Sequence, residues 1–180
     1  MLTLALGHVV MVSVMVMTPL HMNHGVADLE VIGFVISIHI LGMFAFSPLT
    51  GMAVDRFGGR AVAVTGSVLL STATLLASAS PEGESGSLMA GLFLLGLGWS
   101  CTLVSGSTML TAALPAMERP GAQGASDLVM GLTAALGGGL AGVVVDRASF
   151  TVLALIALAV AVLIGVAAAL AAARARPAAA

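Results

Sequence analysis

Long apolar runs separated by short polar connections dominate this sequence. A helix needs about 20 residues to cross the roughly 30 Å hydrocarbon core of a bilayer, so the pattern predicts six membrane-spanning helices. The apolar runs cover residues 2–22, 31–54, 61–79, 87–113, 124–145 and 150–173. Proline, glycine and small polar residues fill the segments between them, as is typical of connections that end helices. We therefore predict an all-α bundle of six transmembrane helices over residues 1–173, with a cytoplasmic tail at 174–180.

The composition places most of this chain in lipid. Hydrophobic residues make up 59% of the sequence and charged residues only 8%, with a mean hydropathy of +1.16. A soluble domain has about 25% charged residues, so this chain has too few charges to cover a water-facing surface. The bilayer is therefore its main partner. A net charge of −2 without any lysine also argues against a nucleic-acid partner.

Catalytic chemistry has little material in this sequence. Cys101 is the single cysteine, and it stands inside an apolar run. The sequence contains no glycine-rich loop of the type that cradles ATP phosphates. We therefore expect neither an enzyme nor a bound cofactor.

The arginines predict how the chain is oriented in the membrane. If the six spans alternate in direction, five of the six arginines fall on one side, and only Arg147 falls on the other. The five are Arg56, Arg60, Arg119, Arg174 and Arg176. Arginine and lysine accumulate in cytoplasmic loops. This bias predicts a multi-pass protein of the plasma membrane with both termini in the cytoplasm.

One segment of the chain recurs. Leu49–Arg56 reads LTGMAVDR and Leu140–Arg147 reads LAGVVVDR, so five of eight positions match at an offset of 91 residues. The copies end the second and the fifth predicted spans. Because three crossings reverse the direction of the chain, the two copies would belong to inverted three-helix units, an architecture of secondary transporters. Chance similarity among glycine, valine and leucine in apolar helices is the alternative.

The charged connection after the second span resembles a known motif. Residues 51–60 read Gly-x-x-x-Asp-Arg-x-Gly-x-Arg, and this pattern resembles the loop that joins the second and third helices in each half of major facilitator superfamily transporters. The glycine-rich segment 137–147 also resembles the eleventh helix of such proteins. The resemblance implies the C-terminal six-helix half of a secondary transporter, with an inverted three-plus-three repeat. It implies transport of a small molecule, coupled to an ion.

A single six-helix half departs from the family pattern, in which two halves rock about a central site. We expect a second half from the same longer chain, from a separate chain or from a second copy of this chain. The short distance between Met1 and the first span favours a fragment or a misplaced start. The alternative is a protein that does not transport, either a membrane scaffold, an accessory subunit or a truncated remnant of a transporter.

The resemblance gives the residues of the loop a gating role. Those residues are Gly51, Asp55, Arg56, Gly59 and Arg60. Asp55 would accept hydrogen bonds from helix-terminal amides or arginines, and the two arginines would be the cationic partners that hold the cytoplasmic side closed. Gly51 would allow close helix packing, and Gly58 with Gly59 would permit a sharp turn. Simple anchoring by positive charge is the alternative.

Three side chains inside the spans are candidates for a substrate or proton pathway. His39 lies eight residues into the second span, which is about 12 Å deep at 1.5 Å per residue. Ionisable groups at such depth are costly and often functional. His8 and Trp99 are the other two candidates. For each, packing or a hydrogen bond to a neighbouring helix is the alternative.

The fifth span supplies three further predictions. Asp127 either caps the start of this helix, together with Ser126, or acts as a proton-coupling carboxylate, and we favour the cap. Gly138 and Gly142, four residues apart, would let neighbouring helices approach closely. Intramembrane charge is otherwise nearly absent, which disfavours a strongly charged substrate.

The first connection contains part of a metal-binding pattern. His21 and His24 have the spacing His-x-x-His, and Asp28 and Glu30 follow them. Structural zinc needs four well-placed ligands, and the loop offers no further histidine or cysteine. We therefore predict no metal site and a solvated loop.

Overall fold

The computed structural model describes residues 1–82 and 84–174 and consists of helices packed side by side. The helices are α1 (Leu2–His24), α2 (Leu29–Phe44), α3 (Ser47–Phe57), α4 (Gly59–Ala79), α5 (Gly86–Ala112), α6 (Arg119–Arg147) and α7 (Phe150–Arg174). The predicted tail at 174–180 lies almost wholly outside the described residues.

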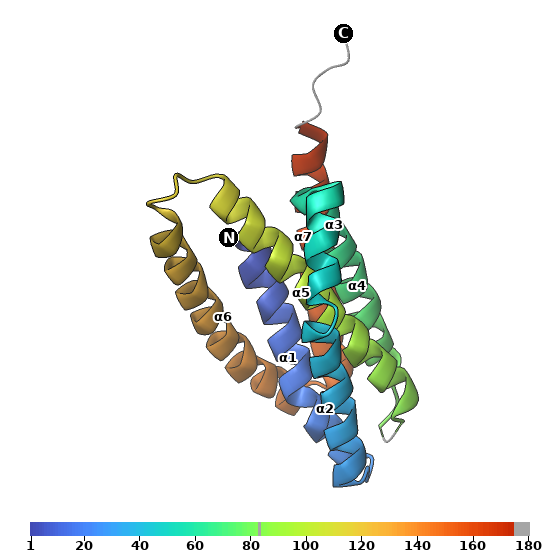
Figure 1. Cartoon of the computed structure of the whole chain (residues 1–180). Coiled ribbons are helices and arrows are strands. Elements are labelled where there is room, and N and C mark those ends of the chain that lie inside the picture. The colour runs from blue at the N-terminus through green and yellow to red at the C-terminus, as the bar shows by residue number, and fades with distance from the viewer. Residues whose placement is uncertain (83, 175–180) are drawn as a thin grey trace.

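Six helical segments in the described chain are long and apolar enough to cross a membrane, because α2 and α3 together form one of them. This confirms the predicted all-helical, six-span fold class. Successive spans run in opposite directions, so the α3–α4 turn and the α5–α6 connection lie at the same end of the bundle (Figure 1). The α6–α7 connection lies at the other end. The two copies of the repeated segment therefore finish at opposite ends, as inverted units would.

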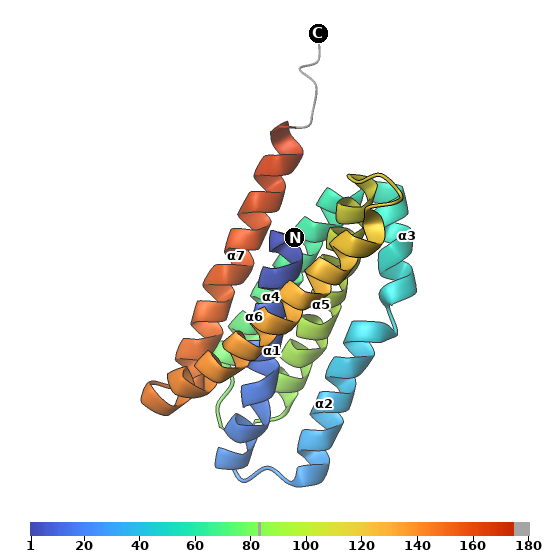
Figure 2. The same ribbon diagram turned by 90° about the vertical axis from the view of Figure 1, so that its left-hand side faces the viewer.

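The second span is interrupted near its middle. Pro48 stands in the first turn of α3 and has no backbone N–H to donate to the carbonyl of Phe44, four residues earlier. The hydroxyl of Ser47 donates to that carbonyl instead, at 2.7 Å. The proline thus separates two helices, while the Phe44 carbonyl keeps a hydrogen-bond partner. Helices α2 and α3 are visibly offset (Figure 2).

The fifth span begins earlier than predicted. Pro120 lies in the first turn of α6, where a missing N–H costs no helical hydrogen bond, so the helix starts at Arg119. The predicted start at residue 124 treated this proline as a breaker. Asp127 consequently lies eight residues inside the helix, and the prediction that it caps the helix is wrong.

Helix α5 lies at the centre of the bundle and touches α1, α2, α3, α4 and α6. Its glycines allow these contacts. A Cβ atom on Gly98 would lie 2.9 Å from the backbone nitrogen of Leu70 on α4, and one on Gly96 would collide with the carbonyl of His39 on α2. On α2, a Cβ atom on Gly42 would lie 2.5 Å from the carbonyl oxygen of Phe93. Small residues thus bring backbones together where lipid provides no hydrophobic drive.

The close approach of α6 does not use the predicted pair of glycines. A Cβ atom on Gly138 would make only an ordinary contact with Val12 at 3.8 Å, and one on Gly142 would meet nothing within 4 Å. The tight contact is at Gly137, where a Cβ atom would lie 3.1 Å from the hydroxyl of Ser13 on α1. The packing role assigned to Gly138 and Gly142 is therefore corrected to Gly137 within this chain.

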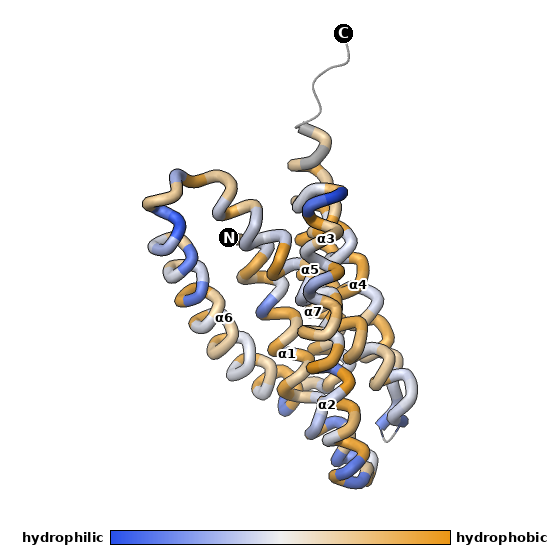
Figure 3. The backbone as a smooth tube through the Cα atoms, viewed as in Figure 1, coloured by the Kyte–Doolittle hydropathy of each residue, from blue (hydrophilic) through white to orange (hydrophobic). Residues whose placement is uncertain are grey.

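Helix α6 packs along one edge and leaves most of its surface open. In an 18-residue apolar stretch of α6, only 11% of the residues are buried, whereas in the equivalent stretch of α5 the buried share is 56%. The N-terminal part of α6 is more hydrophilic than the rest of the helix (Figure 3). The exposed large residues on its open face are Leu128, Leu132, Leu136, Leu140 and Val143.

The first connection is less solvated than predicted. His21 belongs to the last turn of α1 and is only 7% exposed. Its ring stacks on Phe150 of α7 with centroids 4.2 Å apart, and its Nε2 lies 3.2 Å from the carbonyl oxygen of Ser80. His21 is thus a packing residue that ties three parts of the bundle together.

Candidate functional site

The turn between α3 and α4 consists of a single residue, Gly58. Its backbone has φ +84° and ψ 151°, a region that only glycine adopts readily. Gly59 contributes differently, since a Cβ atom there would lie 2.7 Å from Cγ of Met109 and 3.3 Å from the carbonyl oxygen of Ser105. The first glycine therefore makes the turn, and the second lets the start of α4 lie against α5.

The charges of this turn point away from the chain's own core. Asp55, Arg56 and Arg60 are all exposed. The Arg56 guanidinium lies 5.5 Å from the centroid of the Phe57 ring, within the range of a cation–π contact. Among the side chains that the structure describes, none of the three forms an ion pair. The carboxylate of Asp55 is thus free to accept hydrogen bonds from a group outside this chain.

Gly51 does not have the packing role that was predicted for it. A Cβ atom at this position would meet nothing within 4 Å. The close packing expected at Gly51 is therefore absent within this chain, and α3 presents open space there.

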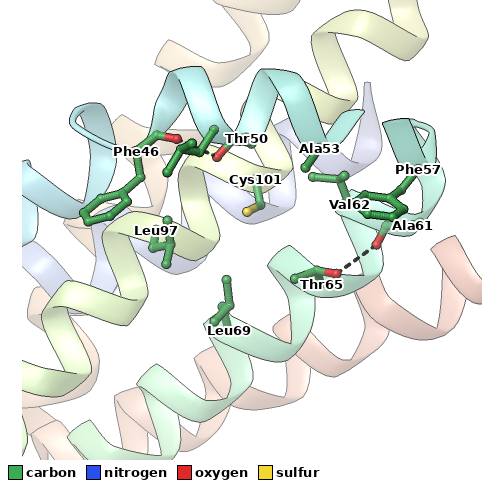
Figure 4. Close-up of a pocket in the computed structure, with 11 residues that line it drawn as sticks. Phe46, Thr50, Ala53, Phe57, Ala61, Val62, Thr65, Leu69, Leu97 and Cys101 are labelled. Carbon is green, nitrogen blue, oxygen red and sulfur yellow. Dashed lines mark hydrogen bonds between the residues drawn. The ribbon is translucent and has the colours of Figure 1, made fainter. Parts of the chain in front are cut away.

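A cavity of about 490 Å³ lies beneath the turn, between α3, α4 and α5 (Figure 4). Its walls are mostly apolar, with Phe46 and Phe57 at its two ends and the thiol of Cys101 between them. The hydroxyl groups in the wall are already engaged: Thr65 donates to the carbonyl of Ala61 at 3.1 Å, and Thr50 to that of Phe46 at 3.2 Å. This cavity was not predicted from the sequence. Pro48, which interrupts the second span before α3, was the feature of the sequence that could have indicated it.

Two of the predicted pathway residues form one unit. The indole Nε1 of Trp99 on α5 donates a hydrogen bond of 2.8 Å to Nδ1 of His8 on α1. The ring of Phe44, the last residue of α2, meets Trp99 edge to face with centroids 6.0 Å apart. Trp99 is 7% exposed, whereas His8 is half-buried. Three helices thus contribute one aromatic cluster inside the membrane-spanning region.

His39 stands apart from this unit. Its side chain is fully buried, and Nδ1 lies 2.8 Å from the carbonyl oxygen of Leu92 on α5. A carbonyl only accepts, so Nδ1 carries the hydrogen, and in the neutral ring Nε2 is then an acceptor. Nε2 is buried and has no hydrogen-bond partner among the described residues. The bond to Leu92 agrees with the alternative for His39, a hydrogen bond to a neighbouring helix. Because Nε2 has no partner among the described residues, the pathway role stays a prediction.

Asp127 lines a recess of about 400 Å³ between α5 and α6. The other polar side chains of this recess are Ser107, Thr108 and Gln123. The Ser107 hydroxyl donates to Oε1 of Gln123 at 3.2 Å, and the Thr108 hydroxyl donates to the carbonyl of Val104 at 2.8 Å. The structure therefore places Asp127 beside polar groups rather than at a helix cap.

Comparison with known proteins adds independent information. The family model of the Major Facilitator Superfamily matches residues 1–180. The MFS-type transporter YddS of Bacillus subtilis (strain 168) is 37% identical over 150 residues, which cover 83% of this chain and 34% of that protein. A second protein of that organism, the MFS-type transporter YdeG, is 38% identical over 153 residues, covering 85% of this chain and 36% of that protein.

A third relative carries a more specific name. The riboflavin transporter RfnT of Brucella anthropi is 32% identical over 126 residues, which cover 69% of this chain and 31% of that protein. The chain thus spans about a third of the length of the curated relatives it matches.

Proposed function

The chain belongs to the major facilitator superfamily, and we propose on this basis that it forms the C-terminal six-helix half of a secondary transporter. That transporter moves a small molecule across the plasma membrane, coupled to an ion, and catalyses no covalent chemistry. The observation that carries the proposal is the α3–α4 turn, where a single glycine holds Asp55, Arg56 and Arg60 exposed at one end of the bundle.

The turn acts as one part of a latch between two halves. Asp55 forms no ion pair among the described side chains, and a helix end or an arginine of the opposite half would give it a charge-assisted hydrogen bond. Such bonds, formed in one conformation only, would favour the state closed to the cytoplasm. In this proposal both termini and this turn lie on the cytoplasmic side.

The open face of α6 supports the need for a second half. In the bilayer the leucines of this face could contact lipid, but an exposed polar stretch near the start of the same helix is costly there. A second six-helix half, from the same longer chain, a separate chain or another copy, would cover both. Transport then follows from rocking of the two halves around a site at their interface.

Transport is tested by comparing the small-molecule content of cells. Cells that produce the chain in its native reading frame are compared by mass spectrometry with cells that lack it and with cells that carry Asp55→Asn. A change in at least one small molecule that Asp55→Asn weakens is the expected result. Equal contents in all three would favour the non-transporting alternative, a scaffold, an accessory subunit or a remnant.

Orientation is tested separately with reporter fusions. A reporter fused after residue 60 should report the cytoplasm, and one fused after residue 84 should report the opposite side. The reverse pattern would overturn the proposed placement of the termini and of the turn.

A further inference from the structure

The carboxylate of Asp127 has no internal counter-charge. It is the one acidic residue of the sequence that lies more than two turns from either end of its helix. Eight residues separate it from Arg119, about 12 Å along the axis. The Nε of Arg119 donates to the carbonyl of Leu114, in the preceding connection. Among the described side chains Asp127 forms no ion pair.

The side chain of Asp127 is exposed on α6, a helix long and apolar enough to span a membrane. Charges inside membrane-spanning helices are costly and are met by a counter-charge, by water or by a bound ligand. The recess beside Asp127 has a volume of about 400 Å³, within the range of small-molecule sites. There is thus room for a ligand next to the charge.

The hydroxyl groups of the recess can only accept hydrogen bonds from a ligand. Ser107 and Thr108 have already donated their hydroxyl hydrogens, to Gln123 and to the carbonyl of Val104. Their remaining lone pairs, together with the carboxylate oxygens of Asp127, form a set of acceptors. The amide nitrogen of Gln123 is the remaining side-chain donor. Such a set favours a ligand that carries several N–H donors and a positive charge.

The remaining wall of the recess is apolar. Leu103 and Val104 supply it, and both are half-buried. A hydrated inorganic cation gains nothing from such a surface, whereas an organic cation can place its hydrocarbon part there. One carboxylate matches one positive charge.

We propose that the recess between α5 and α6 is a binding site for a small organic monocation, in which a protonated amine is held by Asp127, Ser107 and Thr108. The apolar part of the cation lies against Leu103 and Val104. This inference deepens the proposed transport function and rests on it for its biological role, because it names the class of molecule that the half recognises. The binding itself requires no transport.

The site is tested by ligand binding to the full chain in phosphatidylcholine nanodiscs. Saturation-transfer NMR is recorded with phenethylammonium and with 2-phenylethanol, a neutral molecule with the same ring and chain length. Phenethylammonium should bind the unmodified chain, and Asp127→Asn should weaken its affinity about tenfold or more, the effect of losing one charge-assisted contact. Affinity for 2-phenylethanol should be low and unchanged by that substitution.

Two further variants keep the test decisive. Asp146→Asn removes the other acidic side chain of α6, which is also exposed but does not line the recess, and should leave binding unchanged. Thr108→Val removes one acceptor while keeping the side-chain shape and should weaken binding several-fold, so a folding defect in a single variant cannot decide the result. Equal affinity of the unmodified chain and Asp127→Asn for phenethylammonium would overturn the proposal, as would equal binding of 2-phenylethanol.

The outcome is separable from that of the transport experiment. Cation binding that depends on Asp127, without any change in the small-molecule content of cells, would support the site and contradict transport. Transport without cation binding would overturn the site alone, and Asp127 would then carry a proton or meet a charge of the second half.

Discussion

Trp99 and His8 are 91 residues apart in the sequence and are joined by a hydrogen bond of 2.8 Å between α5 and α1. The indole N–H can only donate, so Nδ1 of His8 must be the acceptor and the imidazole must be neutral with its hydrogen on Nε2. The bond therefore fixes both the tautomer of His8 and the relative position of the two helices. It also leaves the Nε2–H of His8 as a donor on the less buried side of the pair.

We predict that Trp99→Phe and His8→Leu each destabilise the fold, and that the two effects are not additive. Interhelical hydrogen bonds in membranes contribute about 0.6 kcal/mol on average and up to about 1.7. A double-mutant cycle, measured by reversible unfolding in detergent, should give a coupling energy in that range. Fully additive losses would mean that the bond contributes nothing to stability.

The turn at Gly58 should not tolerate a side chain. Its φ of +84° with ψ of 151° is almost exclusive to glycine. Gly58→Ala should therefore lower the free energy of unfolding by about 1–3 kcal/mol. Gly51→Ala is the matched control, because a Cβ atom there meets nothing within 4 Å and alanine favours a helix. Equal stability of the two variants would contradict the structure of the turn.

Replacing His39 should separate its structural part from a functional one. The carbonyl of Leu92 lies within α5 and can accept a helical hydrogen bond. It therefore keeps a partner when the bond from His39 is lost. His39→Leu should therefore change the free energy of unfolding by no more than about 1 kcal/mol. If the predicted pathway role holds, the same substitution in an intact transporter should strongly reduce uptake. Unchanged uptake would reduce His39 to a packing residue.

The single cysteine reports on the cavity beneath the turn. Cys101 is 7% exposed and lines that cavity, so a membrane-permeant maleimide should reach it slowly. Ala53→Trp fills the cavity from α3 and should slow labelling further, as followed by mass spectrometry. Met52→Trp is the control, because Met52 is 65% exposed and lies outside the cavity wall. This substitution should not slow the labelling of Cys101.

Asp55→Asn tests the latch in an intact transporter that contains this half. Asparagine keeps the shape of aspartate and removes the charge that would accept hydrogen bonds from the opposite half. Transport should change while the amount of inserted protein stays constant, as measured by uptake and by quantitative immunoblotting. Unchanged uptake would leave the turn as a membrane anchor only.

The six spans could be predicted because hydropathy and helix length are local properties of the sequence. Pro48 alone indicates only a kink in the second span, since the rescue of the Phe44 carbonyl depends on the hydroxyl of Ser47. The start of α6 was misplaced because Pro120 is harmless in a first turn and disruptive elsewhere. A proline alone does not reveal which case applies.

The site was harder to predict because its contacts are tertiary. Trp99, His8, His39 and Asp127 were recognised as unusual residues in apolar segments. The pairing of Trp99 with His8, and the recess beside Asp127, depend on which helices become neighbours. The same limit explains Gly138 and Gly142, because glycine spacing along a helix does not specify which of its faces meets another helix.

The interruption between α2 and α3 divides one membrane span into two helices near its middle. Helix α2 ends at Phe44, in contact with Trp99. Helix α3 carries Asp55 and Arg56 and is joined to α4 by one glycine. The carbonyl of Phe44 accepts from the hydroxyl of Ser47, so no backbone hydrogen bond to that carbonyl joins α3 to α2. The turn that carries Asp55 and Arg56 is thereby separated from the aromatic cluster around Trp99 by a break in the ladder of backbone hydrogen bonds.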